Sequence, residues 1–534
     1  MSLIPGQCSV LIVGAGPSGL MMAAQLLRNG VHPLIIDRKT RPSQSSKALT
    51  VQARTLEIFR QMGLDQSAIV QGNVISQIQL HNELNHSANE VSTLELSSSG
   101  EQKSHFPYML VLEQYKTERL LIDYLTINTC PIYWNTELLD LSLTDENVTT
   151  NVKRNDHEQT IQCDWLIAAD GAHSKVASTL PVSFSAAKDE HRYYAADIQV
   201  NLDSGKEAIH FFSGDQGFAA CYPMQSNSLR CTGMVPAALR KNDDLSFADL
   251  KPYLTFTLGV SVQNEQCTWF STYPVRRKTA ENFSIQRCFL IGDAAHVHTP
   301  IGGQGMNAGL QDAANLAWKL AGVIKERYSS KILKTYHQER RPIARQISKT
   351  ADRVFNTYFS SNWFSRNIRR YFASAILGDA GSQKHIHEKT LRFISQAAQN
   401  YRSAGLSVHH SQSKLVRAGD RLPYLKLFDE KLNEETDLHS WCSGVGFTLL
   451  VIGHLNERDL FLLAKWIKQT YPFDLNFYYL PPSDRNQHVL DAFEISKKQR
   501  RALIVRPDLH IGYLNDAVVI DMLDTYLKET VGWR

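Results

Sequence analysis

The stretch "CSVLIVGAGPSGLMMAAQLLRNGVHPLIIDR", from Cys8 to Arg38, has the pattern of a buried strand, a glycine-rich turn, a helix and a second strand. Apolar runs at Ser9–Val13 and Leu34–Ile36 predict the two strands, and residues 20–27 predict a helix covered on both sides. Gly30 can end that helix. This order of elements predicts a Rossmann-like α/β fold at the start of the chain.

The turn carries the pattern G-x-G-x-x-G at Gly14, Gly16 and Gly19. In such a turn the first glycine permits the sharp bend, the second lets the backbone approach a diphosphate, and the third lets helix pack on strand. The diphosphate would lie at the positive N-terminus of the helix, and Asp37 would accept a hydrogen bond from a ribose hydroxyl. A serine nucleophile elbow is excluded, because its closing glycine would fall at Leu20.

A second glycine-rich stretch, "GDAAHVHTPIGGQGMNAG" at Gly292–Gly309, follows a predicted strand at Cys288–Ile291 and precedes a predicted helix. Two strand–loop–helix sites this far apart suggest one long ligand held at both ends, and FAD is such a ligand. Asp293 would accept from the ribityl chain. The amides of Gly303–Asn307 would face the flavin N1 and C2 carbonyl, where reduced flavin is anionic and a helix N-terminus is favourable.

The rest of the chain divides into a strand-rich region and an α/β tail. "FAACYPMQSNSLRCTGMV", Phe218–Val235, predicts a hairpin turned at Ser226–Asn227. In the tail, "GFTLLVIG" and "RALIVRPDLHIGYL" predict buried strands separated by a helix around residues 458–471. The stretch "NWFSRNIRRYF", residues 362–372, predicts a helix with a basic face, which we interpret as solvated rather than membrane-bound.

The composition of the chain limits the classes of binding partner and the cellular compartment that we expect. The chain has 534 residues, 43% hydrophobic and 21% charged, with a net charge of +4, which disfavours nucleic acid as a partner and predicts two or three folded domains. No apolar run is long enough to span a membrane, and eight cysteines without C-x-x-C predict reduced thiols and a cytoplasmic location. His296 and His298 form H-x-H, but no accompanying ligand cluster supports a metal, so we predict no metal site and a structural hydrogen-bonding role for His296.

At this point the chain resembles the class A flavoprotein aromatic hydroxylases, the family of p-hydroxybenzoate hydroxylase and phenol hydroxylase. The elements that carry the resemblance occur in order and cover most of the chain: "GAGPSG", "VQARTLEIFRQMGL", "EQYKTERLL", "AADGAHSKV", "GDAAHVHTPIGGQGMNAGLQDAANLAWKL" and "YHQERRPIA". The resemblance implies a Rossmann-like FAD-binding domain interleaved with a β-sheet substrate domain, followed by a thioredoxin-like α/β domain. The expected divisions are 1–180 and 281–400 for FAD binding, 181–280 for the substrate sheet and 401–534 for the tail.

The motifs and the resemblance together nominate residues for the cofactor and for the substrate pocket. The resemblance implies that Arg54 and Gln114 touch the flavin or ribityl chain, Asp170 the cofactor and Pro300 the flavin face. The complete expected cofactor set is Gly14, Gly16, Pro17, Ser18, Gly19, Asp37, Arg38, Arg54, Gln114, Asp170, Gly292, Asp293, Pro300, Gly303, Gly305, Met306 and Asn307. The pocket candidates are His210, Phe212, Tyr222 and Arg230, and no catalytic base can be named.

One position departs from the family pattern. The middle motif usually reads D-G-x-x-S-x-x-R, but this chain has Ala177 at the last position. In the family that arginine orients the motif and is linked to NADPH docking. Lys175 is a candidate substitute. In the tail, the single Cys442 excludes dithiol chemistry, which leaves a packing or dimer role.

The resemblance implies a monooxygenase with non-covalent FAD. NADPH or NADH would reduce the flavin, O₂ would form a C4a-hydroperoxide, and an electron-rich phenol or polycyclic aromatic would take one oxygen; homodimerisation is a further expectation. Two alternatives stay open: a same-fold enzyme performing epoxidation, Baeyer-Villiger insertion or substrate oxidation, and a non-catalytic FAD-binding protein. Product analysis and flavin reduction by NADPH separate the three.

Overall fold

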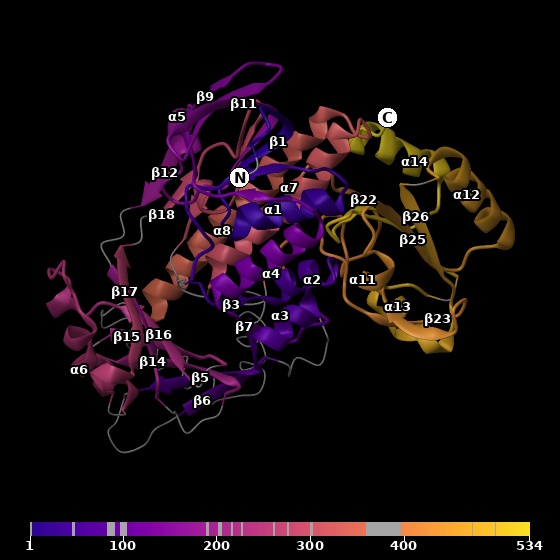
Figure 1. Cartoon of the computed structure of the whole chain (residues 1–534). Helices are drawn as coiled ribbons and strands as arrows, with labels where there is room; N and C mark the ends of the chain where they lie inside the picture. The colour runs from indigo at the N-terminus through magenta and orange to yellow at the C-terminus, as the bar shows by residue number, and fades with distance from the viewer. Residues whose placement is uncertain are drawn as a thin grey trace.

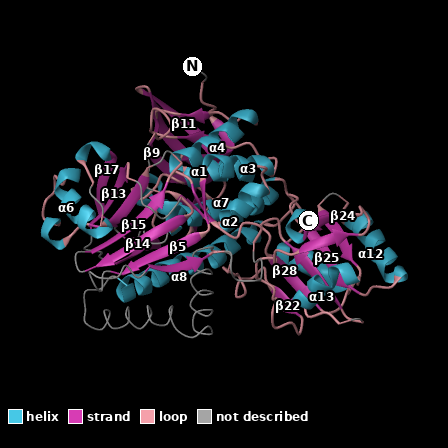
Figure 2. Cartoon of the chain, turned by 90° about the horizontal axis from the view of Figure 1, so that it is seen from below, coloured by secondary structure: helices cyan, strands magenta, loops and turns pink. Residues whose placement is uncertain are grey.

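A computed structural model describes most of the chain. The described residues are 3–44, 48–82, 91–96, 104–187, 192–200, 206–214, 217–225, 228–259, 262–274, 277–298, 303–358, 396, 398–472, 474–496 and 498–534. They form three bodies, with a strand-rich body and the C-terminal body on opposite sides of a central one (Figures 1 and 2). The predicted turn at Ser226–Asn227, Pro300 and the predicted helix at residues 362–372 lie outside the described residues.

The central body is built on an eight-stranded sheet in which β1, from the opening motif, occupies an inner position. The main path runs β19-β20-β11-β1-β2-β8, and β10 joins β11 and β9. Its strands are β1 (Gln7–Val13), β2 (Leu34–Ile36), β8 (Ile132–Tyr133), β9 (Thr136–Leu143), β10 (Val148–Arg154), β11 (His157–Ala168), β19 (Ser284–Ile285) and β20 (Cys288–Leu290). β1 pairs in parallel with β2 and β11, and β11 with β20, as a doubly wound sheet requires. The predicted Rossmann-like fold is confirmed.

Helices and two three-stranded sheets complete the central body. α1 follows the first glycine turn and α7 the second, and the two helices pack against each other. The helices are α1 (Pro17–Arg28), α2 (Ala53–Arg60), α3 (Asp65–Gln71), α4 (Gln114–Ile127), α5 (Lys175–Thr179), α7 (Gln304–Ile324) and α8 (Lys334–Tyr358). The sheets are β3-β7-β4 (Thr50–Val51, Met109–Val111, Asn73–Ile75) and β12-β18-β21 (Phe184–Ala187, Arg277–Ala280, His296–Val297).

The strand-rich body is a seven-stranded sheet with α6 (Phe247–Leu258) packed on one face. Its order is β17-β13-β16-β15-β14-β5-β6, with β5 (Gln77–Asn82), β6 (Val91–Glu95), β13 (Arg192–Ile198), β14 (Ala208–Gly214), β15 (Gly217–Pro223), β16 (Leu229–Met234) and β17 (Cys267–Pro274). β15 and β16 pair antiparallel, which confirms the predicted hairpin. β5 and β6 come from the first 100 residues, so the sheet also draws on the range expected to bind FAD.

The C-terminal body has a five-stranded mixed sheet in the order β22-β28-β27-β25-β26. Its strands are β22 (Val408–His410), β25 (Phe447–Gly453), β26 (Leu475–Leu480), β27 (Arg500–Val505) and β28 (Ile511–Asn515), beside the hairpin β23 (Lys426–Asp429) and β24 (Glu434–Asp437). The helices are α11 (Leu438–Trp441), α12 (Glu457–Thr470), α13 (Gln487–Ala492) and α14 (Ile520–Thr525), followed by a π-helical turn at Tyr526–Val531. The predicted tail strands and helix are present; the thioredoxin-like assignment stays a prediction.

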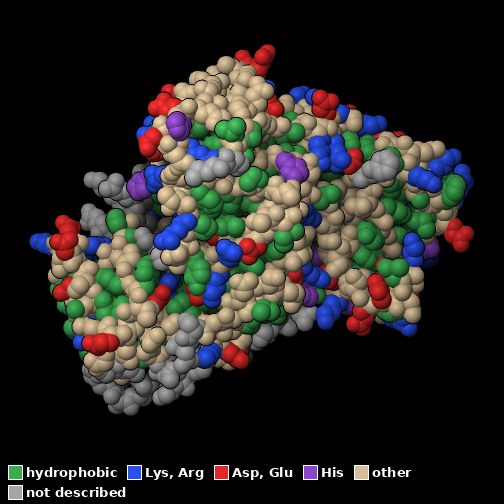
Figure 3. Space-filling model, viewed as in Figure 1, with side chains coloured by type: hydrophobic (Ala, Val, Ile, Leu, Met, Phe, Trp, Pro, Cys, Tyr) green, Lys and Arg blue, Asp and Glu red, His purple; other side chains and the backbone are tan. Residues whose placement is uncertain are grey.

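The face of the molecule shown in Figure 3 is mixed in charge, which agrees with the near-neutral net charge. On the face shown in Figure 3, basic and acidic side chains alternate over all three bodies without a broad area of one sign. Among the described residues, no helix combines the length and the apolar character needed to cross a membrane.

Candidate cofactor cleft

The first glycine turn uses its glycines in two different ways. Gly14 has φ = +110°, and a Cβ there would lie 2.3 Å from the carbonyl oxygen of Ala169. A Cβ on Gly19 would lie 1.9 Å from the carbonyl oxygen of Gly14. Gly16, the N-cap of α1, has no heavy atom within 4 Å of its Cβ position. Two glycines therefore allow close packing, while Gly16 faces open space at a helix N-terminus, as the motif predicts.

Asp37 lies beside this turn at the end of β2. Its Oδ2 accepts from the Ala15 amide at 2.6 Å, and its Oδ1 accepts from the Lys39 amide at 2.8 Å. These bonds fix a buried carboxylate next to the diphosphate-binding turn, where the predicted ribose contact would be made. The neighbouring Arg38 is exposed.

The glycines of the second turn likewise fall into two kinds, those that allow close packing and one that faces open space. A Cβ on Gly292, which has φ = +56°, would lie 2.3 Å from Ser18 Oγ, and one on Gly309 would lie 2.2 Å from the same atom. Ser18 of α1 thus fits between two glycines of the other segment. By contrast, no heavy atom comes within 4 Å of a Cβ on Gly305, in the first turn of α7. Asp293, on the short 3-10 turn after β20, is exposed.

The side chain of Asn307 is engaged in hydrogen bonds to other parts of the protein. Its Nδ2 donates to the carbonyls of Thr50 and Gly303, both at 2.9 Å. Its Oδ1 accepts from the Gln52 amide at 3.0 Å and from the Thr55 hydroxyl at 2.8 Å. The side chain therefore joins α7 to β3 and α2, which leaves the backbone amide for the cofactor role expected of this position. Met306, beside it, is partly buried.

Asp312 is a buried residue of α7, next to the second glycine turn, that the sequence analysis did not identify. Its fully buried carboxylate accepts from the Gly292 amide at 3.0 Å, from Arg340 Nε at 2.7 Å, and hydrogen-bonds His296 Nε2 at 2.6 Å. Burial alone would raise the pKa of Asp312, but His296 and Arg340 together lower it well below its ordinary value. Asp312 fixes the turn that starts at Gly292, and the structural role predicted for His296 is confirmed.

The Asp170 turn is closed by its own side chains. Asp170 Oδ1 accepts from the Ser174 hydroxyl at 2.6 Å, and Oδ2 accepts from the Val176 amide at 3.1 Å. Ser174 caps α5 by accepting from the amide of Ala177 at 2.9 Å. Burial raises the pKa of Asp170. Ala177 is buried and Lys175 is exposed, so neither brings a charge to the inside of the turn.

Two residues expected at the flavin are engaged with other protein groups. Arg54 Nη1 pairs with Glu57 Oε2 at 3.1 Å, and Nη2 donates to the carbonyl of Asp508 at 2.6 Å, so its guanidinium points toward the C-terminal body. This orientation is determined by the position of the C-terminal body, which the local sequence motif does not specify. Gln114 donates to Glu118 Oε1 at 2.8 Å.

The four pocket candidates lie on two opposite faces of the seven-stranded sheet. Phe212 packs in the cluster that includes Phe247 of α6, and His210, two residues before it in β14, shares that face. Tyr222 packs instead against residues of the central body, and Arg230 lies directly opposite it in register. The structure therefore turns only Tyr222 and Arg230 toward the central body. His210 and Phe212 face α6 because side chains alternate along each strand.

Arg230 is already paired within the sheet. Its guanidinium contacts both carboxylate oxygens of Asp197, at 2.5 and 2.7 Å, and lies 4.7 Å from the centre of the Trp269 ring. The face toward the central body thus presents an aromatic ring and a neutralised ion pair.

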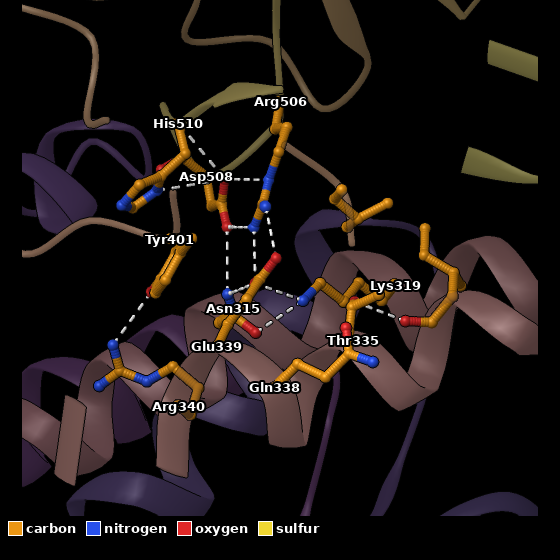
Figure 4. A network of polar contacts seen from close by, with 12 residues as sticks. Asn315, Lys319, Thr335, Gln338, Glu339, Arg340, Tyr401, Arg506, Asp508 and His510 are labelled. Atoms are coloured by element: carbon orange, nitrogen blue, oxygen red, sulfur yellow. Dashed lines mark hydrogen bonds and ion pairs between the residues drawn. The ribbon is translucent and has the colours of Figure 1, made fainter. Parts of the chain in front are cut away.

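A buried ionic network joins the central and C-terminal bodies, and the sequence analysis did not find it (Figure 4). Glu339 of α8 contacts Lys319 of α7 at 2.7 Å and Arg506 at 2.6 Å, and Arg506 contacts Asp508 at 2.5 Å. Burial lowers the pKa of Lys319 to about 8. Burial would raise the pKa of Glu339, but Arg506 and Lys319 lower it to about 2.

Comparisons with known proteins agree with this geometry. A family model described as "FAD binding domain" matches residues 7–351. The chain is 32% identical over 343 residues to 6-methylpretetramide 4-monooxygenase of Streptomyces rimosus, covering 64% of this chain and 60% of that protein. It is 31% identical over 536 residues to the uncharacterized aromatic compound monooxygenase YhjG of Bacillus subtilis (strain 168), covering 98% and 97%. A crystal structure of the flavin-dependent monooxygenase PieE with FAD and substrate shares the fold, with a TM-score of 0.81, 19% identity and coverage of 98% and 99%.

Proposed function

The chain belongs to the FAD binding domain family and is an FAD-dependent oxidoreductase, and from this premise we propose that it hydroxylates a phenolic or polycyclic aromatic substrate with a nicotinamide cofactor and O₂. The observation that carries the proposal is the paired cleft: Gly16 and Gly305 face open space at two helix N-termini. The names of the two relatives, a pretetramide monooxygenase and an aromatic compound monooxygenase, support the substrate class.

The residues present fit FAD. Space for a diphosphate exists where a Cβ on Gly16 would stand, and the N-termini of α1 and α7 supply the partial positive charge that a diphosphate and an anionic flavin ring require. When bound, FAD supplies the hydride and oxygen chemistry.

The protein groups then have binding and positioning roles. Asp37 would accept from the ribose, Asp293 from the ribityl chain, and Asp312 holds the second turn in place through the Gly292 amide. Tyr222 and Arg230 line the face where an aromatic substrate would lie, and exclusion of water there protects the activated oxygen. The neutral Arg230–Asp197 pair and the nearby Trp269 suit an aromatic ring better than an anion.

The finer assignments belong to the same proposal. They are the expected cofactor residues apart from Arg54 and Gln114, the divisions near residues 180, 280 and 400 with β5 and β6 added to the substrate sheet, the thioredoxin-like tail, the homodimer and the cytoplasmic location. Free thiols at all eight cysteines support the reducing compartment. The exposed side chains Phe461 and Leu462 on α12 make the tail the first place to look for a dimer contact, which sizing of the wild type and a Phe461→Ser variant would test.

The experiment that tests the function is anaerobic stopped-flow mixing of the yellow protein with NADPH or NADH, with and without monocyclic and polycyclic phenols. We expect flavin bleaching to be accelerated by one class of phenol, and aerobic turnover to give a product heavier by one oxygen atom. Epoxidation and Baeyer-Villiger insertion also add one oxygen atom, so the NMR spectrum of the product separates them from hydroxylation, whereas a product that gains no oxygen would favour substrate oxidation. If neither NADPH nor NADH bleaches the flavin with any phenol, the result would favour a non-catalytic flavoprotein.

A further inference from the structure

Lys278 reaches the Asp170 turn from a different part of the chain. It lies in β18, between β12 and β21, opposite Val297 in register. Its Nζ donates to the carbonyl oxygen of Ala172 at 2.6 Å and lies 4.6 Å from the centre of the Phe184 ring. A charge-assisted bond of this kind is about twice as strong as a neutral one, so the contact is a specific tether.

The tether connects the two halves of the cofactor cleft. The Asp170 turn backs the first glycine turn, since a Cβ on Gly14 would lie 2.8 Å from the Asp170 amide nitrogen. β21, which pairs with β18, begins two residues after Ala294, the last residue of the short 3-10 turn that carries Asp293. Lys278 therefore links the Asp170 turn, which packs behind the first glycine turn, to β21, the strand that follows Gly292.

The charge of Lys278 acts on two carboxylates near the glycine turns. The ammonium interacts favourably with Asp293 and with Asp170, which belong to segments more than 120 residues apart. Burial lowers the pKa of Lys278, and these two carboxylates act against that effect. Asp170 is itself buried enough to have a raised pKa. A cation at this point keeps two acidic groups compatible with a nearby anionic diphosphate.

We propose that Lys278 is the positioning residue that prepares the cleft for FAD, by fixing the Ala172 carbonyl and by placing one positive charge beside the Asp170 turn. It supplies from β18 the cation that Ala177 cannot supply from α5. The inference rests on the proposed function and deepens it, because it assigns a role to a residue outside the glycine turns and outside the middle motif.

The test compares Lys278→Met and Lys278→Arg with Lys175→Met, which removes one positive charge from an exposed position at the start of α5, next to the Asp170 turn. Flavin is stripped from each protein, and the apoprotein is titrated with FAD while flavin fluorescence is recorded. We expect Lys278→Met to weaken FAD binding at least about tenfold, because FAD must then order the released Asp170 turn when it binds. Lys278→Arg should recover most of the affinity, and Lys175→Met should bind FAD as the wild type does.

A second measurement separates positioning from general stability. The unfolding midpoint of the Lys278→Met apoprotein should stay within about 3 °C of wild type, whereas the stabilisation of the protein by saturating FAD should fall. Wild-type affinity in Lys278→Met would overturn the inference, as would an equal loss in Lys175→Met or a loss explained by a collapsed apoprotein. If the wild type itself binds no FAD, the proposed function fails; if it binds FAD and only the Lys278 effect is missing, the inference alone fails.

Discussion

The cofactor cleft and the buried ionic network that holds the C-terminal body, here called the joint, are built from different kinds of residue. The cleft is made of glycines and helix N-termini, and two of its positions, Gly16 and Gly305, have no protein atom near the side that a Cβ would fill. The joint is filled by Lys319, Glu339 and Arg506, whose side chains are all buried and paired. A site that admits a ligand keeps space and unpaired backbone dipoles, whereas a permanent contact satisfies every charge with a neighbour.

The largest expected effect comes from breaking the joint with Arg506→Met. This change leaves Glu339 and Asp508 buried without their shared cation, which costs about 3–5 kcal/mol of unfolding free energy for a pair broken inside a protein. Urea unfolding followed by circular dichroism measures it. The control is Arg402→Met, which removes a partly exposed pair with Asp420 and should cost less than about 1 kcal/mol. Equal losses in the two variants would show that the joint is no stronger than a surface contact.

The next effect separates the two kinds of glycine in the cleft. Gly292→Ala places a Cβ 2.3 Å from Ser18 Oγ at φ = +56°, so the apoprotein itself should lose about 2 kcal/mol or more of stability. Gly305→Ala meets no protein atom and sits in a helix, so the apoprotein should gain up to about 1 kcal/mol while FAD binding weakens. Unfolding of the stripped proteins and FAD titration provide both numbers. Normal FAD affinity in Gly305→Ala would mean that the open side is not where the cofactor lies.

Acid should weaken the joint before it affects the glycine turns. The pKa of Glu339 is lowered from 4.5 to about 2, so its ionised form stabilises the fold above pH 4.5. That contribution, about 3 kcal/mol, is lost as the pH falls from about 4.5 to 2. Glu57, which Arg421 and Arg54 hold near pKa 2 against burial, adds a loss in the same direction. Unfolding free energies at pH 7, 5, 4 and 3 give the slope, and Glu339→Gln should flatten it. An unchanged slope in that variant would place the acid sensitivity elsewhere.

The smallest effect compares the two faces of the seven-stranded sheet. Tyr222→Phe removes a hydroxyl on the face toward the central body, so KM for the aromatic substrate should rise about two- to tenfold, the range for one hydrogen bond. His210→Gln alters the face under α6, and KM should not change. Steady-state kinetics on both variants checks this. A larger KM change in His210→Gln would place the substrate on the α6 side.

Local patterns predicted the parts of the site that are local in sequence. Both glycine turns, the strands before them and the helices after them follow from spacing and periodicity, because each lies within about 40 residues of chain. The partners of Asp312 and Glu339 could not be predicted in this way, since Arg340 lies 28 residues from Asp312 and Arg506 lies 167 residues from Glu339.

Orientation was the other missing information. The resemblance implied that Arg54 touches the flavin or ribityl chain, but it did not say which side of α2 meets the tail, where the guanidinium bonds the Asp508 carbonyl. Strand alternation places His210 and Tyr222 on opposite faces of the sheet, but the sequence does not say which face α6 covers.

Ser18 lies against Gly292 and Gly309, and this contact sets an order for biosynthesis. A ribosome releases α1 long before β20 and α7 exist, so the first glycine turn must wait for almost 300 residues before its second half can close over it. Glu339 also waits, because its arginine partner is translated 167 residues later. The nascent chain therefore carries first an incomplete cleft and later an acid without its arginine partner, and these are intervals in which a growing multidomain chain is open to chaperones and to misassembly.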